Sequence, residues 1–378
     1  MASSSLPLTQ RVQEATDDTL GLCYQCGACT AACPLRVPIR KLLRASQLGM
    51  DELCVSSAGL WNCAACRLCE LACPRGVKIL GAVHSLRVAG FERRATPAKL
   101  NEAAWGVYED GNPWGGKKAE RMAWARGLEG VSAQGQKKYL LYVGCASSYD
   151  PRLQNVARSL ARVLAGAGMD FGVIGQDENC CGDALYQAGE EGYLEELIQG
   201  NIRAFDRSGA ERVVTLSPHC LGMFRTVYPK YGKMVPAQHY TELLAELVET
   251  GKLAPRGQGR KTVTYHDPCY LGRHYGIYEE PRKVLESIPG VTLAEMEESK
   301  DNSLCCGGGG GLMWSEAVGE RPSHARVLQA ARTGASTLAT SCPYCILNFE
   351  DAAKTSGLSG LGVFDICELI LGQPGGGV

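Results

Sequence analysis

The sequence predicts a helical N-terminal domain followed by two pseudo-symmetric α/β domains. Its 378 residues are enough for two or three domains, each with an apolar core. One four-cysteine pattern occurs twice near the start of the chain, in residues 23–34 and 63–74. A different cysteine pattern occurs twice in the remaining two thirds, the second copy shifted by 124 or 125 residues. We therefore expect a helical domain at 1–110, a linker at 111–138, and α/β domains at 139–255 and 260–378.

Composition and charge exclude several classes of protein. The chain carries 39 Lys and Arg against 40 Asp and Glu, so its net charge does not indicate a nucleic acid or an anionic membrane as partner. Residues 1–20 are polar and lack the apolar stretch of a secretory signal. No apolar run approaches the roughly 20 residues that cross a bilayer. We expect a soluble, cytoplasmic protein without a membrane span, and its odd number of cysteines, 19, points to metal ligation rather than to disulfides.

The N-terminal cysteines have the spacing of a two-cluster ferredoxin. Residues 23–34 read CYQCGACTAACP and residues 63–74 read CAACRLCELACP, so C-x2-C-x2-C-x3-C-P occurs twice. In two-cluster ferredoxins the first three cysteines of such a run hold one cluster and the fourth holds the other. A proline ends each loop because it lacks an N–H and disfavours helix in the preceding residue. The spacing predicts two [4Fe-4S] sites, one with Cys23, Cys26, Cys29 and Cys73, the other with Cys63, Cys66, Cys69 and Cys33.

Structural zinc is the alternative for these cysteines, since zinc sites also use C-x2-C pairs. Each run holds four cysteines in ferredoxin order, which favours iron–sulfur clusters. Between the runs, residues 38–53 place apolar side chains at helical spacing, and we expect one helix there. Cys54 and Cys367 lie outside every repeated set and are interpreted as buried, non-ligating residues.

The remaining two thirds of the chain are an internal duplication. NCCGDAL at 179–185 matches LCCGGGG at 304–310, and TLSPHC at 215–220 matches TSCPYC at 340–345. In each copy a short apolar strand ends at the first cysteine, helical stripes follow, and another strand precedes the last cysteine. This alternation predicts two α/β halves related by a pseudo-two-fold. The matching thiols are Cys145, Cys180, Cys181 and Cys220 in the first half, and Cys269, Cys305, Cys306 and Cys345 in the second.

The two halves differ at one matching position. Cys342 gives the second half a fifth thiol, whereas Ser217 occupies the equivalent place in the first half. Converging strand ends could bring all the second-half thiols to one centre, although buried cysteines without a ligand role are the alternative. The first half keeps four thiols, which suffice for a cluster but not for the same one without a substitute oxygen ligand. Whether that half binds a cluster stays open in the sequence.

Several residues beside these cysteines are candidates for chemistry. His266 and His219 lie within a few residues of predicted ligands, and either could deliver a proton to a nascent thiolate or simply hydrogen-bond a loop. Glycines 307–311 lack the lysine and hydroxyl of a phosphate loop, so we expect their backbone to approach cluster sulfurs or a ligand. Three further residues could line a pocket for an anionic substrate, namely Tyr270, Arg273 and His274.

These motifs resemble a known family. The N-terminal part, with CYQCGACTAACP, VPIRKLLR, LWNCAAC and CPRGV, resembles the small ferredoxin-like subunit of heterodisulfide reductase. Residues 139–370 resemble the paired CCG domains of that enzyme's catalytic subunit, so the chain looks like a fusion of the two. The resemblance implies two [4Fe-4S] cubane clusters and a non-cubane [4Fe-4S] cluster on the five second-half thiols. It leaves open a further cluster in the first CCG domain, where Ser217 departs from the pattern.

The resemblance also implies a function. No flavin or nicotinamide fingerprint is visible, so a partner must deliver single electrons. We expect a subunit of a hetero-oligomeric complex that receives electrons from a flavoprotein of the heterodisulfide reductase type, or another redox partner, and reduces a disulfide or an equivalent acceptor. The alternative is a pure electron-transfer subunit, resembling those of glycolate oxidase or anaerobic glycerol-3-phosphate dehydrogenase.

Overall fold

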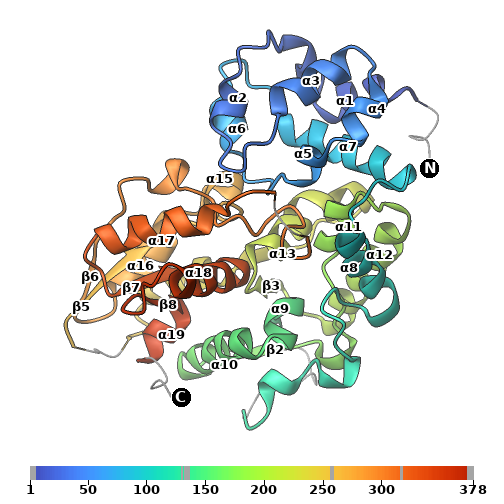
Figure 1. Ribbon diagram of the computed structural model, residues 1–378. Coiled ribbons are helices and arrows are strands. Elements are labelled where there is room, and N and C mark those ends of the chain that lie inside the picture. The colour runs from blue at the N-terminus through green and yellow to red at the C-terminus, as the bar shows by residue number, and fades with distance from the viewer. Residues whose placement is uncertain (1–5, 129–130, 132–136, 256–258, 316–317, 373–378) are drawn as a thin grey trace.

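The computed structural model describes residues 6–128, 131, 137–255, 259–315 and 318–372. Within these residues a helical N-terminal part precedes two separate four-stranded parallel sheets, each covered by helices. Figure 1 shows helices α1 to α7 (residues 8–92), in blue and light blue, above the first sheet region in green and the second in orange and red, whereas α8 (Ala98–Asp110) lies beside α11 (Asp183–Ala188) and α12 (Gly192–Ser208) of the first half. The predicted fold class is therefore confirmed.

The helical part is built from two similar loop-and-helix units. A residue with positive φ, Gly27 in one unit and Arg67 in the other, precedes a short helix that carries the third cysteine of each run. The single helix expected at 38–53 is instead two helices, because the chain reverses at Gly49, which has φ 66°. The helices are α1 Leu8–Ala15, η1 Thr19–Leu22, α2 Ala28–Ala31, α3 Ile39–Gln47, α4 Asp51–Val55, α5 Ala58–Trp61, α6 Leu68–Leu71, α7 Ile79–Glu92 and α8 Ala98–Asp110.

The first half of the duplication forms a parallel sheet of order β2-β1-β3-β4. Two short turns precede it, η2 Lys118–Glu120 and η3 Ala123–Ala125, and η3 packs against α9 and α10 through the buried Trp124. The elements are β1 Tyr139–Tyr142, α9 Gly144–Tyr149, α10 Pro151–Gly166, β2 Phe171–Gly172, η4 Gly175–Asp177, α11 Asp183–Ala188, α12 Gly192–Ser208, β3 Arg212–Thr215, α13 Pro218–Gly222, η5 Met223–Val227, η6 Tyr228–Tyr231, β4 Ala237–His239 and α14 Tyr240–Glu249.

The second half repeats this topology with the order β6-β5-β7-β8. In both halves the last strand leads into a helix whose N-terminus carries a capping box. His239 is the N-cap residue of α14 and Asp365 is the N-cap residue of α19. The elements are β5 Lys261–Tyr265, α15 Gly272–Tyr275, α16 Glu279–Glu286, β6 Val291–Leu293, η7 Lys300–Asn302, α17 Pro322–Arg332, β7 Thr337–Thr340, α18 Pro343–Thr355, β8 Gly362–Asp365 and α19 Ile366–Leu371.

The halves pack on each other symmetrically. Helix α10 contacts α19, and α14 contacts α16, which are equivalent pairs when the two copies are exchanged. One apolar cluster includes side chains of both halves. At this interface the hydroxyl of Tyr240 donates to the buried Asp365 carboxylate at 2.8 Å, and Arg152 pairs with Glu350 and Glu368. The pseudo-two-fold predicted from the repeat therefore brings the cysteine-bearing ends of the two sheets toward each other.

Candidate iron–sulfur sites

The first ferredoxin run forms an open pocket near the surface. Cys23, Cys26, Cys29 and Cys73 line one cavity, together with Arg40 and other residues of α3 and the 73–77 loop. Burial raises the pKa of the Cys29 thiol, and the neighbouring Cys23 and Cys73 raise it further. The structure thus places the fourth cysteine of the second run beside the first three of the first run.

The second run forms a more deeply buried set. Burial raises the pKa of the Cys69 thiol, and the nearby Cys63, Cys66 and Cys33 add to that rise. Burial likewise raises the pKa of Cys33 to about 11, with Cys63 and Cys66 among its neighbours. The backbone N–H of Ala65 donates to Cys63 Sγ at 3.4 Å, the kind of hydrogen bond that tunes a ligated sulfur.

All five thiols of the second half lie close together. Cys306 and Cys345 have their sulfurs 3.3 Å apart, and those of Cys269 and Cys305 are 3.8 Å apart. Cys342 lies beside Cys345, and this neighbour lowers the pKa of the Cys342 thiol although burial acts in the opposite direction. The loop that begins at the Cys-Cys pair supplies donors, because the N–H groups of glycines 307 and 308 donate to the sulfurs of Cys305 and Cys306 at 3.3 and 3.4 Å.

The first half gathers its four thiols in the equivalent place. Cys145, Cys180, Cys181 and Cys220 line one cavity, and each is buried. Gly144 has φ +78°, and a Cβ there would lie 3.3 Å from Cys220 Sγ, so glycine allows the strand end to approach the set.

Sequence reasoning missed an ion pair beside this first-half set. Arg121 and Glu178 are both nearly inaccessible and form a salt bridge of 2.8 Å. The Glu178 carboxylate also accepts from the N–H groups of Val143 and Gly144, and Arg121 Nη2 lies 3.6 Å from Cys145 Sγ. Arg121 belongs to the segment predicted as a linker, where no motif marks it.

Ser217 and Cys342 occupy equivalent N-cap positions but act differently. Ser217 Oγ accepts the N–H of His219 at 3.3 Å and so caps α13. Cys342 makes no side-chain cap to α18 and contacts its neighbouring thiols instead. The serine hydroxyl is therefore already engaged by the backbone, whereas the cysteine sulfur remains available to a cluster.

His219 lies between the two halves. Its Nδ1 is 3.4 Å from the Asp183 carboxylate, and its ring stacks on Tyr270 at 3.9 Å between centroids. Although burial lowers the pKa of His219, Asp183 and Cys342 outweigh burial and raise it to about 10. The pKa of Cys342 falls to about 6 because Cys345 and His219 outweigh its own burial. His219 thus lies beside an acid of the first half and near a thiol of the second.

His266 is placed differently. The side chain is fully buried, its Nδ1 accepts from Arg326 Nε at 3.2 Å, and its Nε2 lies 3.5 Å from Cys345 Sγ. Burial, reinforced by the Arg326 charge, holds the pKa of His266 well below its usual range. A neutral imidazole whose Nδ1 accepts must carry its proton on Nε2, so His266 is oriented as a donor to that sulfur.

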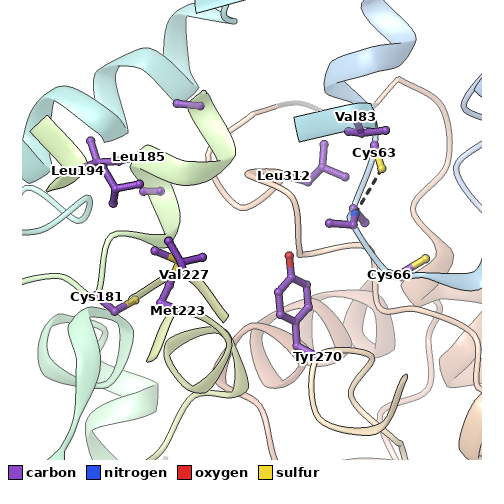
Figure 2. Packing of buried hydrophobic residues seen from close by; sticks show 14 of the residues in the cluster. Cys63, Cys66, Val83, Cys181, Leu185, Leu194, Met223, Val227, Tyr270 and Leu312 are labelled. Atoms are coloured by element: carbon purple, nitrogen blue, oxygen red, sulfur yellow. Dashed lines mark hydrogen bonds between the residues drawn. The ribbon is translucent and has the colours of Figure 1, made fainter. Parts of the chain in front are cut away.

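The second ferredoxin loop packs directly on the second-half loop. Cys66 and Cys305 are close enough to perturb each other's titration. A Cβ on glycine 310 would lie 1.9 Å from the Cys63 carbonyl oxygen, so only glycine fits there. Figure 2 shows the loop with Cys63 and Cys66 near Leu312 and Tyr270, and Cys181 in a neighbouring part of the same cluster. The glycine run 307–311 therefore donates N–H groups to the second-half sulfurs and also allows the ferredoxin loop to pack closely at this junction.

Tyr270, Arg273 and His274, predicted to line a substrate pocket, contribute to this junction. Arg273 Nε donates to the Cys66 carbonyl at 2.6 Å, and His274 Nε2 donates to the Ala65 carbonyl at 2.9 Å. Arg273 Nη1 donates to the carbonyls of residues 301 and 303, while its buried Nη2 has no hydrogen-bond partner. Tyr270 and His274 also line a cavity of about 370 Å³ that reaches His219, whereas Arg273 does not line it.

Arg87 of α7 joins all three parts of the chain. Its guanidinium donates to the carbonyls of Leu60 and Cys63 at 3.2 and 2.8 Å within the helical part. It also donates to the Gln187 side chain of the first half and to the carbonyl of glycine 310 in the second, each at 3.0 Å. Only 1% of the side chain is exposed. The ferredoxin loops are thus fixed on both halves by one buried cation.

The donor sets fit iron–sulfur clusters, because thiols gather in groups of four and five and backbone N–H groups reach their sulfurs. Among the described residues, no three His, Cys, Asp or Glu side chains are arranged to hold a single metal ion. Cys54 and Cys367 are fully buried outside these sets. No helix in the described ranges has the length and apolar character needed to span a bilayer.

Comparisons with known protein families agree with this geometry. The CCG family, described as a cysteine-rich domain, matches residues 139–225 and 263–350. The Fer4_9 family, described as a 4Fe-4S dicluster domain, matches residues 22–78.

Individual relatives align with most of this chain. A subunit of the dihydromethanophenazine:CoB–CoM heterodisulfide reductase of Methanosarcina barkeri is 30% identical over 391 residues, which cover 93% of each chain. The "Probable iron-sulfur-binding oxidoreductase FadF" of Bacillus subtilis is 36% identical over 328 residues, 84% of this chain and 46% of its own length. The EtfAB:quinone oxidoreductase of Syntrophomonas wolfei is 33% identical over 333 residues, with the same coverage. The chain spans about half the length of these last two relatives.

Proposed function

The chain belongs to the heterodisulfide-reductase-like family of iron–sulfur oxidoreductases, and from that premise we propose that it carries single electrons from a redox partner to a disulfide or an equivalent acceptor. The observation that carries the proposal is the direct packing of the 63–66 loop on the 305–310 loop. This contact makes the second half the direct neighbour of the second ferredoxin site.

The cysteine sets would hold two [4Fe-4S] cubanes in the N-terminal part and a non-cubane [4Fe-4S] cluster on the five second-half thiols. Bound clusters supply one-electron transfer. Reduction of a disulfide to two thiols takes two electrons and two protons. His219 would hold a proton beside Cys342, and His266 would orient its Nε2–H on Cys345. The two histidines predicted from the sequence would thus have different tasks.

We infer that the electron donor is a flavoprotein subunit of the heterodisulfide reductase type. The chain has no visible flavin or nicotinamide fingerprint of its own, and the M. barkeri relative is named as one subunit of a reductase.

The proposal is tested on protein purified anaerobically. Iron and acid-labile sulfide are expected in amounts that fall in Cys305→Ala and Cys306→Ala variants, while the ferredoxin-type electron paramagnetic resonance (EPR) signals persist. Cys54→Ala is the matched control, because Cys54 is equally buried but lies outside the sets. Unchanged iron content in both ligand variants would refute the second-half site.

A pure electron-transfer subunit is the second candidate, and one residue favours it. Ser217 leaves the first half without a fifth thiol, so the two halves cannot offer matching five-thiol sites to the two sulfurs of a disulfide. A thiol-dependent paramagnetic signal in the oxidised protein would favour disulfide chemistry. Its absence with a panel of thiols, in protein of full iron content, would favour electron transfer alone.

A further inference from the structure

The first ferredoxin site opens onto a distinct surface, the Cys26 face, formed by Tyr24, Cys26, Arg40 and Arg75, with Leu22 adjoining it through its chain neighbour Cys23. All 19 cysteines lie in the described part of the chain, and Cys26 alone among them is exposed. Arg40 and Arg75 line the same cavity as Cys26. An electron entering or leaving the chain by the shortest route would therefore cross this face.

The charge of this face differs from that of the whole chain. Between Thr19 and Met50 the sequence contains no Asp or Glu, although it contains four Lys and Arg residues. No carboxylate lines the cavity at Cys26. Arg40 and Arg75 are exposed, and neither forms an ion pair with a described carboxylate. A basic face thus lies on a chain whose net charge is −1.

The same face also exposes apolar surface. Tyr24 is 62% exposed and Leu22 is 45% exposed, on either side of Cys23. Aromatic and arginine side chains together are typical of the centre of a protein interface, where they supply most of the binding energy. A surface that bound only small anions would not need these exposed apolar side chains.

We propose that the Cys26 face docks an acidic electron-carrier protein, which presents carboxylates around its own redox centre. This inference rests on the proposed function, since it assigns a purpose to the exposed edge of the first site. Opposite charges would steer the encounter and set the orientation, while Tyr24 and Leu22 would exclude water at the contact.

The test uses the anaerobic, iron-loaded chain and two reductants. Reduced flavodoxin serves as the acidic protein probe, and reduced methyl viologen serves as a small donor that needs no docking surface. The variant Arg40→Glu/Arg75→Glu reverses the charge of the face. The variant Arg40→Gln/Arg75→Gln removes the two positive charges without adding negative ones. The matched control is Arg203→Glu/Arg207→Glu, which places the same charge change on exposed positions of α12.

At low ionic strength the charge-reversed variant should react with flavodoxin at least about tenfold more slowly than the control, and its rate should lose most of its salt dependence. Because reduced methyl viologen is itself a cation, its rate with the charge-reversed variant should not fall below that of wild type. Equal flavodoxin rates in Arg40→Glu/Arg75→Glu and in the control Arg203→Glu/Arg207→Glu, at equal iron content, would overturn the inference. Loss of binding to phosphatidylglycerol vesicles without a change in flavodoxin rate would instead assign the face to a membrane surface. If methyl viologen reduces no centre in the wild-type chain, the proposed function fails rather than the docking surface.

Discussion

Replacement of Arg87 by methionine should undock the ferredoxin loops from the two halves. The change removes the donor of five buried oxygens, the carbonyls of Leu60, Cys63, Gln187 and glycine 310 and the side-chain oxygen of Gln187. Each buried acceptor left without a partner costs about 1–3 kcal/mol. Removal of a buried charge returns several kcal/mol of its desolvation cost. The net loss of docking free energy is therefore about 3–5 kcal/mol, or a factor of about 10²–10⁴ in the docking equilibrium.

Hydrogen exchange measures this loss without requiring a two-state unfolding transition. Amides of residues 60–66 and 307–312 should exchange faster in Arg87→Met, while the strands of both sheets should keep their protection. Arg93→Met is the control, since Arg93 lies just beyond the same helix and makes only partly exposed ion pairs worth at most about 1 kcal/mol. If the two variants show the same exchange at equal iron content, Arg87 does not hold the junction and the reasoning fails.

Three further perturbations concern ionisable side chains that the fold removes wholly or partly from solvent. Glu178→Gln should lower the unfolding temperature more than the double variant Arg121→Met/Glu178→Gln, because an unpaired buried cation costs about 3–5 kcal/mol; equal losses in a thermal-shift series would contradict this. Burial lowers the pKa of His239 to about 3, so the stability it contributes is present above its unfolded pKa near 6.5 and is lost as pH falls toward 3. His239→Asn should therefore flatten the acid side of the plot of unfolding temperature against pH, and an unchanged plot would argue against a neutral, buried imidazole. Arg273→Gln removes a partly buried cation from the neighbourhood of Cys305 and should make the second-half site harder to reduce at constant iron content, as a redox titration followed by EPR would show; an unshifted titration curve would exclude an electrostatic role.

The sequence predicts the parts of this molecule better than the way they meet. Cysteine spacing constrains ligand sets because chelation needs thiols at fixed separations, and the repeat register constrains the topology because both copies must bury the same strands. The structure accordingly has two sheets with one strand order. Arg87, Arg121 and Arg273 carry no such signal, since each acts on partners that are distant in the chain. In the sequence, an arginine in a helix or loop is indistinguishable from an ordinary surface residue until the fold buries it.

The pseudo-two-fold relation of the two α/β halves shows how one fold can form two different cysteine sites. Both halves present a Cys-Cys loop and a helix whose N-cap position faces it, so the backbone treats the copies alike. The difference comes from a single atom, since the Ser217 hydroxyl caps its own helix while the Cys342 sulfur turns to the other thiols. His219 then couples them, because its place beside Cys220 puts its ring against Cys342 of the opposite half. Because the ferredoxin loop packs on the five-thiol half, the half with more sulfur ligands is also the one that electrons would reach first.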